Sequence, residues 1–238
     1  MPKLIVQLLG LLIIIFWSAL SHASCVILLH GLARSDSSMD VLETRLSEPG
    51  YQTVNVAYPS RDFDIATLAK LAVKPALAQC ASEGSVNFVT HSLGGILVRQ
   101  YLSEQNIENL KYVVMLGPPN QGSEVVDKLQ HFPGFHFING DAGMQLGTAE
   151  VSVPNQLDAA RFNVGVIAGN KSINLILSSL IPGVDDGKVS VEHTKLEGMN
   201  DHLVMPVTHT FMMKNKAVIE QVLHYLKHGQ FDTTSRDR

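Results

Sequence analysis

The length, composition and charge of the chain limit what the protein can be. With 238 residues, of which 45% are hydrophobic, the chain can bury one full-sized core, so we expect a single domain. The formal charge is −4, only 17% of the residues are charged, and no run of basic residues precedes the short tail that holds Arg236 and Arg238. This composition argues against nucleic acid as a partner.

The first 23 residues have the pattern of an export signal. Lys3 precedes an apolar run over residues 4–20, and small residues then lead to a cleavage point after Ala23. We therefore predict that residues 1–23 are a signal peptide and that the protein is periplasmic or secreted. An uncleaved membrane anchor is the alternative, because about 17 apolar residues reach the lower limit of a bilayer span.

The rest of the chain alternates apolar strands with amphipathic helices, which we expect to form one domain over residues 24–230 and a frayed tail over 231–238. The expected strands, in chain order, cover residues 25–29, 54–58, 86–90, 112–116, 162–168 and 202–207. The expected helices cover residues 37–48, 64–80 with an interruption or a kink at Pro75, 96–101, 172–180 and 217–228. Residues 120–158 have weak periodicity and are expected to run over the core. This alternation predicts an α/β fold, a three-layer α/β/α sandwich with a mostly parallel sheet of about six strands.

A short turn between the third strand and its helix contains a candidate nucleophile. The turn reads Thr90-His91-Ser92-Leu93-Gly94, with small residues around a serine. It resembles the G-x-S-x-G nucleophile elbow of the α/β-hydrolase lipases and esterases, with Thr90 in place of the first glycine. The resemblance covers the chain from Val26 to about Gly229 and implies that Ser92 is the nucleophile of a serine hydrolase.

The same resemblance implies an oxyanion hole built from main-chain amides. One amide is expected from Leu93, at the start of the helix after the nucleophile, where the helix dipole favours an anion. The second is expected from Leu32, in a His-Gly-Leu loop that resembles the family's oxyanion loop. In that family the histidines equivalent to His30 and His91 have structural roles, which we expect here too.

In this family the acid and the base follow the nucleophile in the chain. The stretch 184–189 resembles the acid loop of lipase-like hydrolases and makes Asp186 the expected acid, with Asp185 as the alternative. His209 directly follows the last strand and is the expected base, with His202, at the start of that strand, as its competitor.

The remaining histidines have simpler explanations than catalysis. His193 precedes the last strand, and His224 and His228 lie on the closing helix. His131 and His136 lack the compact spacing of a metal site, so no metal is implied and no cofactor is required.

The loop Gly117-Pro118-Pro119-Asn120-Gln121-Gly122-Ser123 resembles one found in bacterial lipases and related lipid-deacylating enzymes. It implies an acyl ester or lipid substrate and transient contact with a lipid surface. The apolar residues Phe132, Phe135, Phe137 and Met144 form either an acyl pocket or lid or a part of the core. Two other functions stay open: a thioesterase or amidase of the same fold, and a binding protein that keeps the scaffold without catalysis.

The chain has two cysteines, Cys25 and Cys80. In the topology that the resemblance implies, both lie at the lower edge of the sheet, so we expect a disulfide between them in an oxidising compartment. Cys25 would also suit a lipid-modified start, but His22 stands three residues before it, where such signals have a Leu-like residue.

Overall fold

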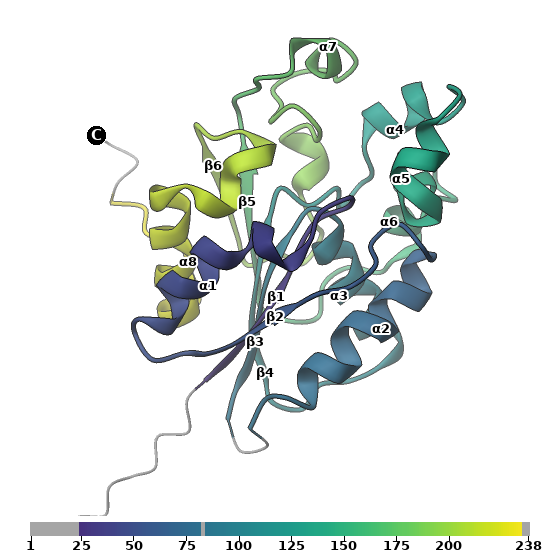
Figure 1. Ribbon diagram of the computed structural model, residues 1–238. Coiled ribbons are helices and arrows are strands. Elements are labelled where there is room, and N and C mark those ends of the chain that lie inside the picture. The colour runs from purple at the N-terminus through teal and green to yellow at the C-terminus, as the bar shows by residue number, and fades with distance from the viewer. Residues whose placement is uncertain (1–23, 82–83, 235–238) are drawn as a thin grey trace, which may run out of the picture.

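The computed structural model describes residues 24–81 and 84–234, which form one parallel sheet with helices on both faces (Figure 1). The predicted signal peptide, residues 1–23, lies outside the described residues. The strands are β1 (Cys25–Leu29), β2 (Gln52–Val56), β3 (Val86–His91), β4 (Leu110–Leu116), β5 (Val164–Gly169) and β6 (Asp201–Met205). The spatial order is β2-β1-β3-β4-β5-β6, and all neighbouring strands pair in parallel. The predicted three-layer α/β fold is confirmed.

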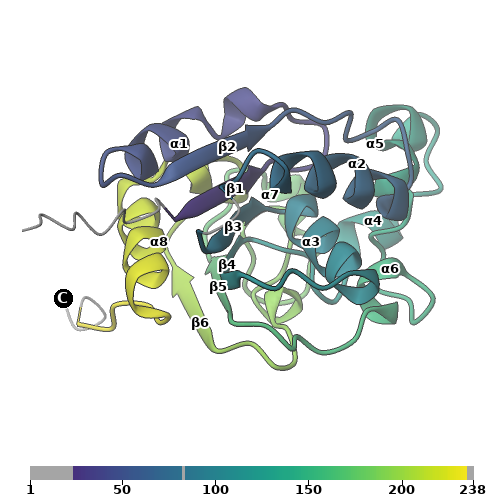
Figure 2. The same ribbon diagram turned by 90° about the horizontal axis from the view of Figure 1, so that it is seen from below.

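Helices cover both faces of the sheet, α1 and α8 on one and α2 and α3 on the other (Figure 2). The four are α1 (Asp40–Ser47), α2 (Ile65–Leu77), α3 (Leu93–Glu104) and α8 (Lys216–His228). Short helices lie in the connections: η1 (Asp36–Ser38), α4 (Glu124–Leu129), α5 (Phe135–Met144), α6 (Val153–Gln156), α7 (Leu175–Ser178), η2 (Glu192–Thr194) and η3 (His209–Lys214).

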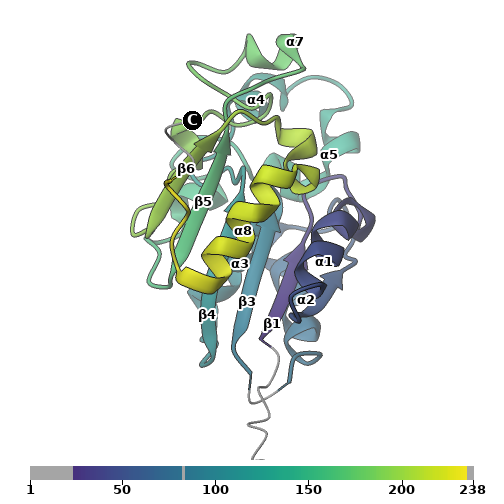
Figure 3. The same ribbon diagram turned by 90° about the vertical axis from the view of Figure 1, so that its left-hand side faces the viewer.

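Strand β1 shows how alternate side chains build two cores. Cys25, Ile27 and Leu29 pack with α2 and α3, whereas Val26 and Leu28 pack with α1 and α8. Figure 3 shows α8 lying across the face that these last two residues share. Because a parallel sheet is covered on both faces, its central strands are continuous apolar runs.

Several element boundaries differ from the predictions, each for a local reason. Strand β2 begins at Gln52, before the predicted residue 54, because main-chain pairing with β1 extends over polar edge positions. The helix is not interrupted at Pro75, one of the two predicted outcomes, since α2 continues through it to Leu77. As expected, Asp64 begins this helix, and its Oδ1 accepts a hydrogen bond from the Thr67 amide at 2.7 Å. The predicted helix over 172–180 is reduced to the four residues of α7.

Phe231 is packed, although the sequence places it in a frayed tail. The residue is buried, its ring centroid lies 4.8 Å from that of Tyr225, and its amide donates to Asp201 Oδ2 at 2.8 Å. The packed part of the chain therefore includes this residue.

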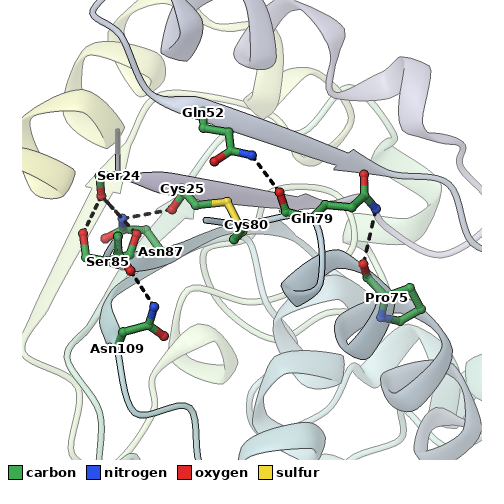
Figure 4. The surroundings of a disulfide bond; sticks show 10 residues. Ser24, Cys25, Gln52, Pro75, Gln79, Cys80, Ser85, Asn87 and Asn109 are labelled. Carbon is green, nitrogen blue, oxygen red and sulfur yellow. Dashed lines mark hydrogen bonds between the residues drawn. A yellow bond between two sulfur atoms is a disulfide. The ribbon is translucent and has the colours of Figure 1, made fainter. Parts of the chain in front are cut away.

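The structure joins Cys25 and Cys80 in a disulfide with a Cα–Cα distance of 5.7 Å, as expected (Figure 4). The bond ties the start of β1 to the chain just after α2. A disulfide indicates a non-reducing compartment. None of the helices in residues 24–81 and 84–234 has the length and apolar character needed to cross a bilayer.

Candidate active site

Ser92 occupies a strained turn between β3 and α3. Its backbone angles are φ 52° and ψ −120°, a combination that costs roughly 1–3 kcal/mol in a residue other than glycine. The turn is held by hydrogen bonds from the Ser92 amide to the Leu116 carbonyl at 2.9 Å and from the Gly95 amide to the Ser92 carbonyl at 3.0 Å. These bonds leave the Ser92 side chain half-buried at the edge of the sheet, where strand β3 ends.

Glycine is required at two positions beside this turn because other protein atoms lie very close. A Cβ on Gly94 would lie 2.6 Å from the Leu29 carbonyl oxygen. A Cβ on Gly31 would lie 2.8 Å from His91 Nδ1 and 3.2 Å from Ser92 Cβ. Thr90 takes the first glycine position of the family pattern, and its side chain is fully buried. A branched residue thus fits at this position.

Leu32 lines the pocket that contains Ser92, and Leu93 directly follows Ser92 in the chain. Leu93 is the first residue of α3, so its amide has no acceptor within the helix. Among the described residues, neither amide donates to another protein atom. Leu32 lies in a loop fixed at the next residue, Ala33, which has φ 54° and whose amide donates to Ser60 Oγ at 3.1 Å. Both amides are therefore without a protein acceptor among the described residues, and their role as oxyanion donors stays a prediction.

His30 and His91 are both buried, and His91 lines the pocket that contains Ser92. His30 stacks on Tyr58 with ring centroids 4.0 Å apart, and its own carbonyl accepts from the Tyr58 hydroxyl. His91 bonds through Nε2 to the His209 carbonyl at 3.0 Å. Burial lowers the pKa of His30 and holds the pKa of His91 well below its usual range. Both rings are therefore neutral near pH 7 and fix the loops around Ser92.

His209 and Asp186 form a buried hydrogen-bonded pair. His209 Nδ1 lies 2.7 Å from Asp186 Oδ2, and the His209 amide donates to the Asp186 carbonyl at 2.9 Å. The other carboxylate oxygen, Oδ1, accepts from the amides of Lys188 at 3.0 Å and Val189 at 2.9 Å. With Oδ2 accepting, Nδ1 carries the ring proton and Nε2 is left as a basic nitrogen.

Asp185 is directed elsewhere. Its Oδ1 accepts from Ser178 Oγ at 2.6 Å and from the Gly187 amide at 2.7 Å, which closes the loop on itself. Of the two adjacent carboxylates, the structure therefore brings only Asp186 to His209.

Gly117, at the end of β4, leaves space for the Asp186–His209 pair. Its φ is 55°, and a Cβ there would lie 3.0 Å from Asp186 Oδ2 and 3.1 Å from His209 Nδ1. The sequence singles out this loop by resemblance alone, and the structure gives a steric reason for its first glycine.

The other histidines lie outside the pocket lining. The His202 ring bonds to Thr194 Oγ1 at 3.0 Å, and the His193 ring lies 3.1 Å from Glu124 Oε1. His136 pairs with Asp141 at the surface, and the rings of His224 and His228 lie together on α8. Within residues 24–81 and 84–234, no group of three or more His, Cys, Asp or Glu could hold a metal ion.

One pocket contains Ser92 and His209 together. Part of its wall is apolar and comes from residues 125–146, which cross the carboxyl ends of the strands. The apolar residues of this wall are Val125, Val126, Phe135 and Leu146. Of the aromatic residues that the sequence suggests for an acyl pocket, Phe135 alone lines it, whereas Phe132 and Phe137 are exposed. Val125, Val126 and Leu146 carry no sequence signal beyond being apolar.

Comparison with known proteins places the fold. No protein-family model and no curated protein sequence matches the chain. Among solved structures, the mature lipase BlEst2 of Bacillus licheniformis superposes with a TM-score of 0.67 at 19% identity, covering 87% of this chain and 92% of the lipase. The metagenomic carboxyl esterase MGS0156 gives 0.68 at 18% identity over 79% of this chain and 65% of the esterase.

A third neighbour is a larger protein. Phospholipase PlaB of Legionella pneumophila gives a TM-score of 0.57 at 20% identity over 73% of this chain, which spans 45% of the phospholipase chain. These neighbours show that the chain has the α/β-hydrolase fold and that structures similar to it are lipases and esterases. At this level of identity, the likeness shows the fold alone, and the chemistry has to be argued from the site itself.

Proposed function

We propose that the protein is a serine hydrolase that cleaves carboxylic esters of acyl or lipid type through an acyl-enzyme intermediate. The observation that carries the proposal is the arrangement at one pocket. A strained Ser92 and a His209 that is hydrogen-bonded to buried Asp186 border the same cavity. Structural likeness to lipases and esterases supports the same class of reaction.

The proposed mechanism has two steps. His209 Nε2 takes the Ser92 hydroxyl proton as Oγ attacks the ester carbonyl, and Asp186 stabilises the imidazolium that forms. The amides of Leu32 and Leu93 stabilise the oxyanion. His209 then returns the proton to the departing alcohol as the ester C–O bond breaks. In the second step His209 activates water, which releases the acid and restores Ser92.

The apolar wall of the pocket favours an acyl chain over a polar group. Val125, Val126, Phe135 and Leu146 offer hydrophobic surface in the same pocket as Ser92. A thioester or an amide would use the same machinery, and a binding protein would need none of it. The strain at Ser92 and the hydrogen bonds that hold the Asp186 carboxylate favour a catalytic function. The strain costs stability and the hydrogen bonds constrain the sequence, and neither is needed for binding alone.

Labelling with a fluorophosphonate probe tests the proposal. Folded protein is expected to form one adduct, located on Ser92 by peptide mass spectrometry, and Ser92→Ala is expected to form none. Hydrolysis rates for p-nitrophenyl esters of increasing chain length, beside a matched thioester and an anilide, then give the bond type. Absence of labelling in folded protein contradicts every catalytic version and leaves the binding protein.

Exposed apolar side chains near the pocket support action at a lipid surface. Phe137 and Ile138 on α5 and Leu175 and Ile176 on α7 are largely exposed, with Phe137 at 86%. Figure 1 shows α4, α5 and α7 at the same end of the molecule, where the strands have their carboxyl ends. Such surface commonly marks an interaction site.

Binding to neutral phosphatidylcholine vesicles tests this contact. The double variant Phe137→Ser/Leu175→Ser is expected to sediment with vesicles less than the parent protein does. Val41→Ser, at an exposed apolar position on α1, is the control and is expected to leave sedimentation unchanged. Equal sedimentation of all three proteins contradicts a lipid-facing role for α5 and α7.

We further propose that the protein is exported, with residues 1–23 as the signal. The Cys25–Cys80 disulfide supports this proposal, because such bonds persist in oxidising compartments. Mass spectrometry of the purified native protein tests it, with a mature chain beginning at Ser24 as the expected result. If the protein is instead bound to the membrane and still carries residues 1–23, this would support the uncleaved membrane anchor.

A further inference from the structure

Two cationic side chains, Arg34 and Lys188, line the pocket that contains Ser92. Arg34 lies in the loop after β1, two residues beyond Leu32, and Lys188 lies in the acid loop, two residues beyond Asp186. The proposed proton transfers use neither side chain, since Lys188 contributes to them only through its main-chain amide. Their presence at the pocket needs a separate explanation.

Neither charge is neutralised within the described structure. In residues 24–81 and 84–234, every ion pair involves other side chains. Asp186 acts on Lys188 electrostatically, but both its oxygens are already engaged by His209 and by two amides. The pocket is therefore locally basic in a chain whose formal charge is −4.

The two cations also lie close enough to affect one another. Partial desolvation in the pocket wall lowers the pKa of Lys188, and the nearby charge of Arg34 lowers it further. Both charges contribute, after burial and His209, to the lowered pKa of His91, the residue that precedes Ser92. A bound anion would relieve this repulsion.

Hydrogen bonds hold the main chain that carries the two cations, whose side chains are exposed. The Lys188 amide donates to Asp186, and the Lys188 carbonyl accepts from Ser123 Oγ at 2.8 Å. On the other loop, Arg34 follows Ala33, whose left-handed backbone is held by Ser60. The two side chains therefore lie on the loops that also contain the proposed acid, Asp186, and the proposed oxyanion donor, the Leu32 amide.

The apolar wall indicates which half of an ester the cations face. Val125, Val126 and Phe135, with Leu146, offer an acyl chain hydrophobic surface, and a charged group there would lose its hydration without a partner. The charged part of a substrate is therefore better placed on the alcohol side of the ester bond.

We propose that Arg34 and Lys188 form an anion subsite for the alcohol portion of the ester. The preferred substrates are then acyl esters whose alcohol carries a phosphate or another anionic group, as a lysophospholipid does. This inference rests on the proposed ester hydrolase function and specifies its substrate class.

A matched pair of soluble substrates tests the subsite. The pair is the butyrate ester of 4-hydroxybenzenesulfonate and that of 4-hydroxybenzenesulfonamide, which differ in charge at the leaving group. We expect kcat/KM to favour the sulfonate by about tenfold, and Arg34→Gln and Lys188→Gln each to reduce this preference by about two- to fivefold. The preference is also expected to shrink between about 0.05 M and about 0.5 M NaCl, because salt screens exposed charges.

The controls separate the subsite from general charge and from the proposed chemistry. Lys74→Gln, on α2 and outside the pocket lining, is expected to keep the full preference and to hydrolyse the sulfonamide ester as the parent does. Equal kcat/KM for the two esters in the parent protein, or an unchanged preference in the Arg34→Gln/Lys188→Gln double variant, overturns the subsite. Failure of the proposed function looks different, since neither ester is then hydrolysed and Ser92 is not labelled.

A second pair identifies the source of the anion. Monomeric 1-acylglycerol 3-phosphate is compared with 1-acylglycerol of the same chain length. A preference for the phosphate that is lost in the double variant supports the subsite with a phospholipid substrate. A charge preference confined to the phenyl esters supports the subsite with a small soluble anionic ester.

Discussion

The two ends of the parallel strands are built in opposite ways. We call the end where the strands begin the linked edge and the end where they finish the strained edge. At the edge where the strands begin, the Cys25–Cys80 disulfide is joined by hydrogen bonds from the Asn87 side-chain amide to Ser24 Oγ at 2.7 Å and to the Cys25 carbonyl at 3.1 Å (Figure 4). A further bond from Asn109 to the Gly84 carbonyl closes the adjacent loop. Covalent and polar links therefore hold this edge together.

The edge where the strands end contains the strain. Ala33 and Ser92 are the described residues other than glycine with positive φ, and both lie in loops at this edge. The buried nitrogens His30 Nε2 and His91 Nδ1 have no hydrogen-bond partner among the described residues. Stabilising links and backbone strain thus occupy opposite ends of the same strands, so changes at the two edges should affect different measurements.

The largest expected effect is on activity at the strained edge. Asp186→Asn is expected to lower kcat/KM for a neutral butyrate ester by about 10⁴-fold, because an amide neither holds the His209 tautomer nor stabilises the imidazolium. Asp185→Asn is the matched control and is expected to retain activity within about tenfold, since its bonds close the loop on itself. Equal losses in the two variants would contradict the assignment of Asp186 as the acid.

The second expected effect is on stability at the linked edge. Replacing both cysteines, as Cys25→Ala/Cys80→Ala, is expected to lower the free energy of unfolding by about 4 kcal/mol, because the bond closes a loop with a sequence separation of 55 residues. Urea denaturation measures this loss. The steady-state rate on the butyrate ester under native conditions is expected to stay within about twofold of the parent rate. A large loss of activity in folded protein would contradict the view that changes at the linked edge leave activity unaffected.

A glycine substitution at each edge sharpens the comparison. Gly117→Ala is expected to lower kcat/KM by about 100-fold, because the new methyl group displaces Asp186 and His209 as well as straining a φ of 55°. Gly50→Ala meets no atom within 4 Å at a φ of 97°, so it adds backbone strain alone and is expected to cost stability without activity. If Gly50→Ala loses as much activity as Gly117→Ala in enzyme assays, then backbone strain, and not contact with Asp186 and His209, causes the loss.

The smallest expected effect is on the pH dependence of stability. The folded pKa of His91 is depressed by burial, so below about pH 6.5 the unfolded chain binds a proton that the folded chain does not. Stability is therefore lost as the pH falls from about 7 to about 5, by up to about 2 kcal/mol for this residue. His91→Gln is expected to flatten this slope, and exposed His131→Gln is expected to leave it unchanged. Urea titrations at several pH values measure both slopes, and a parent-like slope in His91→Gln would exclude this origin.

The sequence predicted the layers of the fold well because buried parallel strands are continuous apolar runs. It missed the start of β2, where Gln52 and Thr53 are polar yet pair with β1. It gave no helices for residues 120–158, whose course depends on tertiary contacts. One such contact is Arg99, which is buried and donates to the carbonyls of Asn120, Pro154 and Leu157.

The candidate site was predictable where chain order and the resemblance to α/β hydrolases constrain it. The structure brings Asp186 and His209 together and puts Ser92 in the same pocket, as that order implies, while their catalytic roles stay predictions. The choice between Asp185 and Asp186 depends on amides at 188 and 189, which only the folded loop positions. Arg34 and Lys188 look like ordinary surface charges in the sequence, so their meeting at one pocket required the structure.

The position of Ser24 has a consequence for orientation. It precedes β1 at the linked edge, and a five-residue strand separates it from the pocket edge by about 17 Å. A chain tethered to a membrane before Ser24 would therefore direct its pocket away from the bilayer that holds it and would reach substrates in the surrounding fluid or in a facing membrane. A released chain would be free to turn α5 and α7 toward any lipid surface, so cleavage after Ala23 would determine which lipid surfaces the proposed active site can reach.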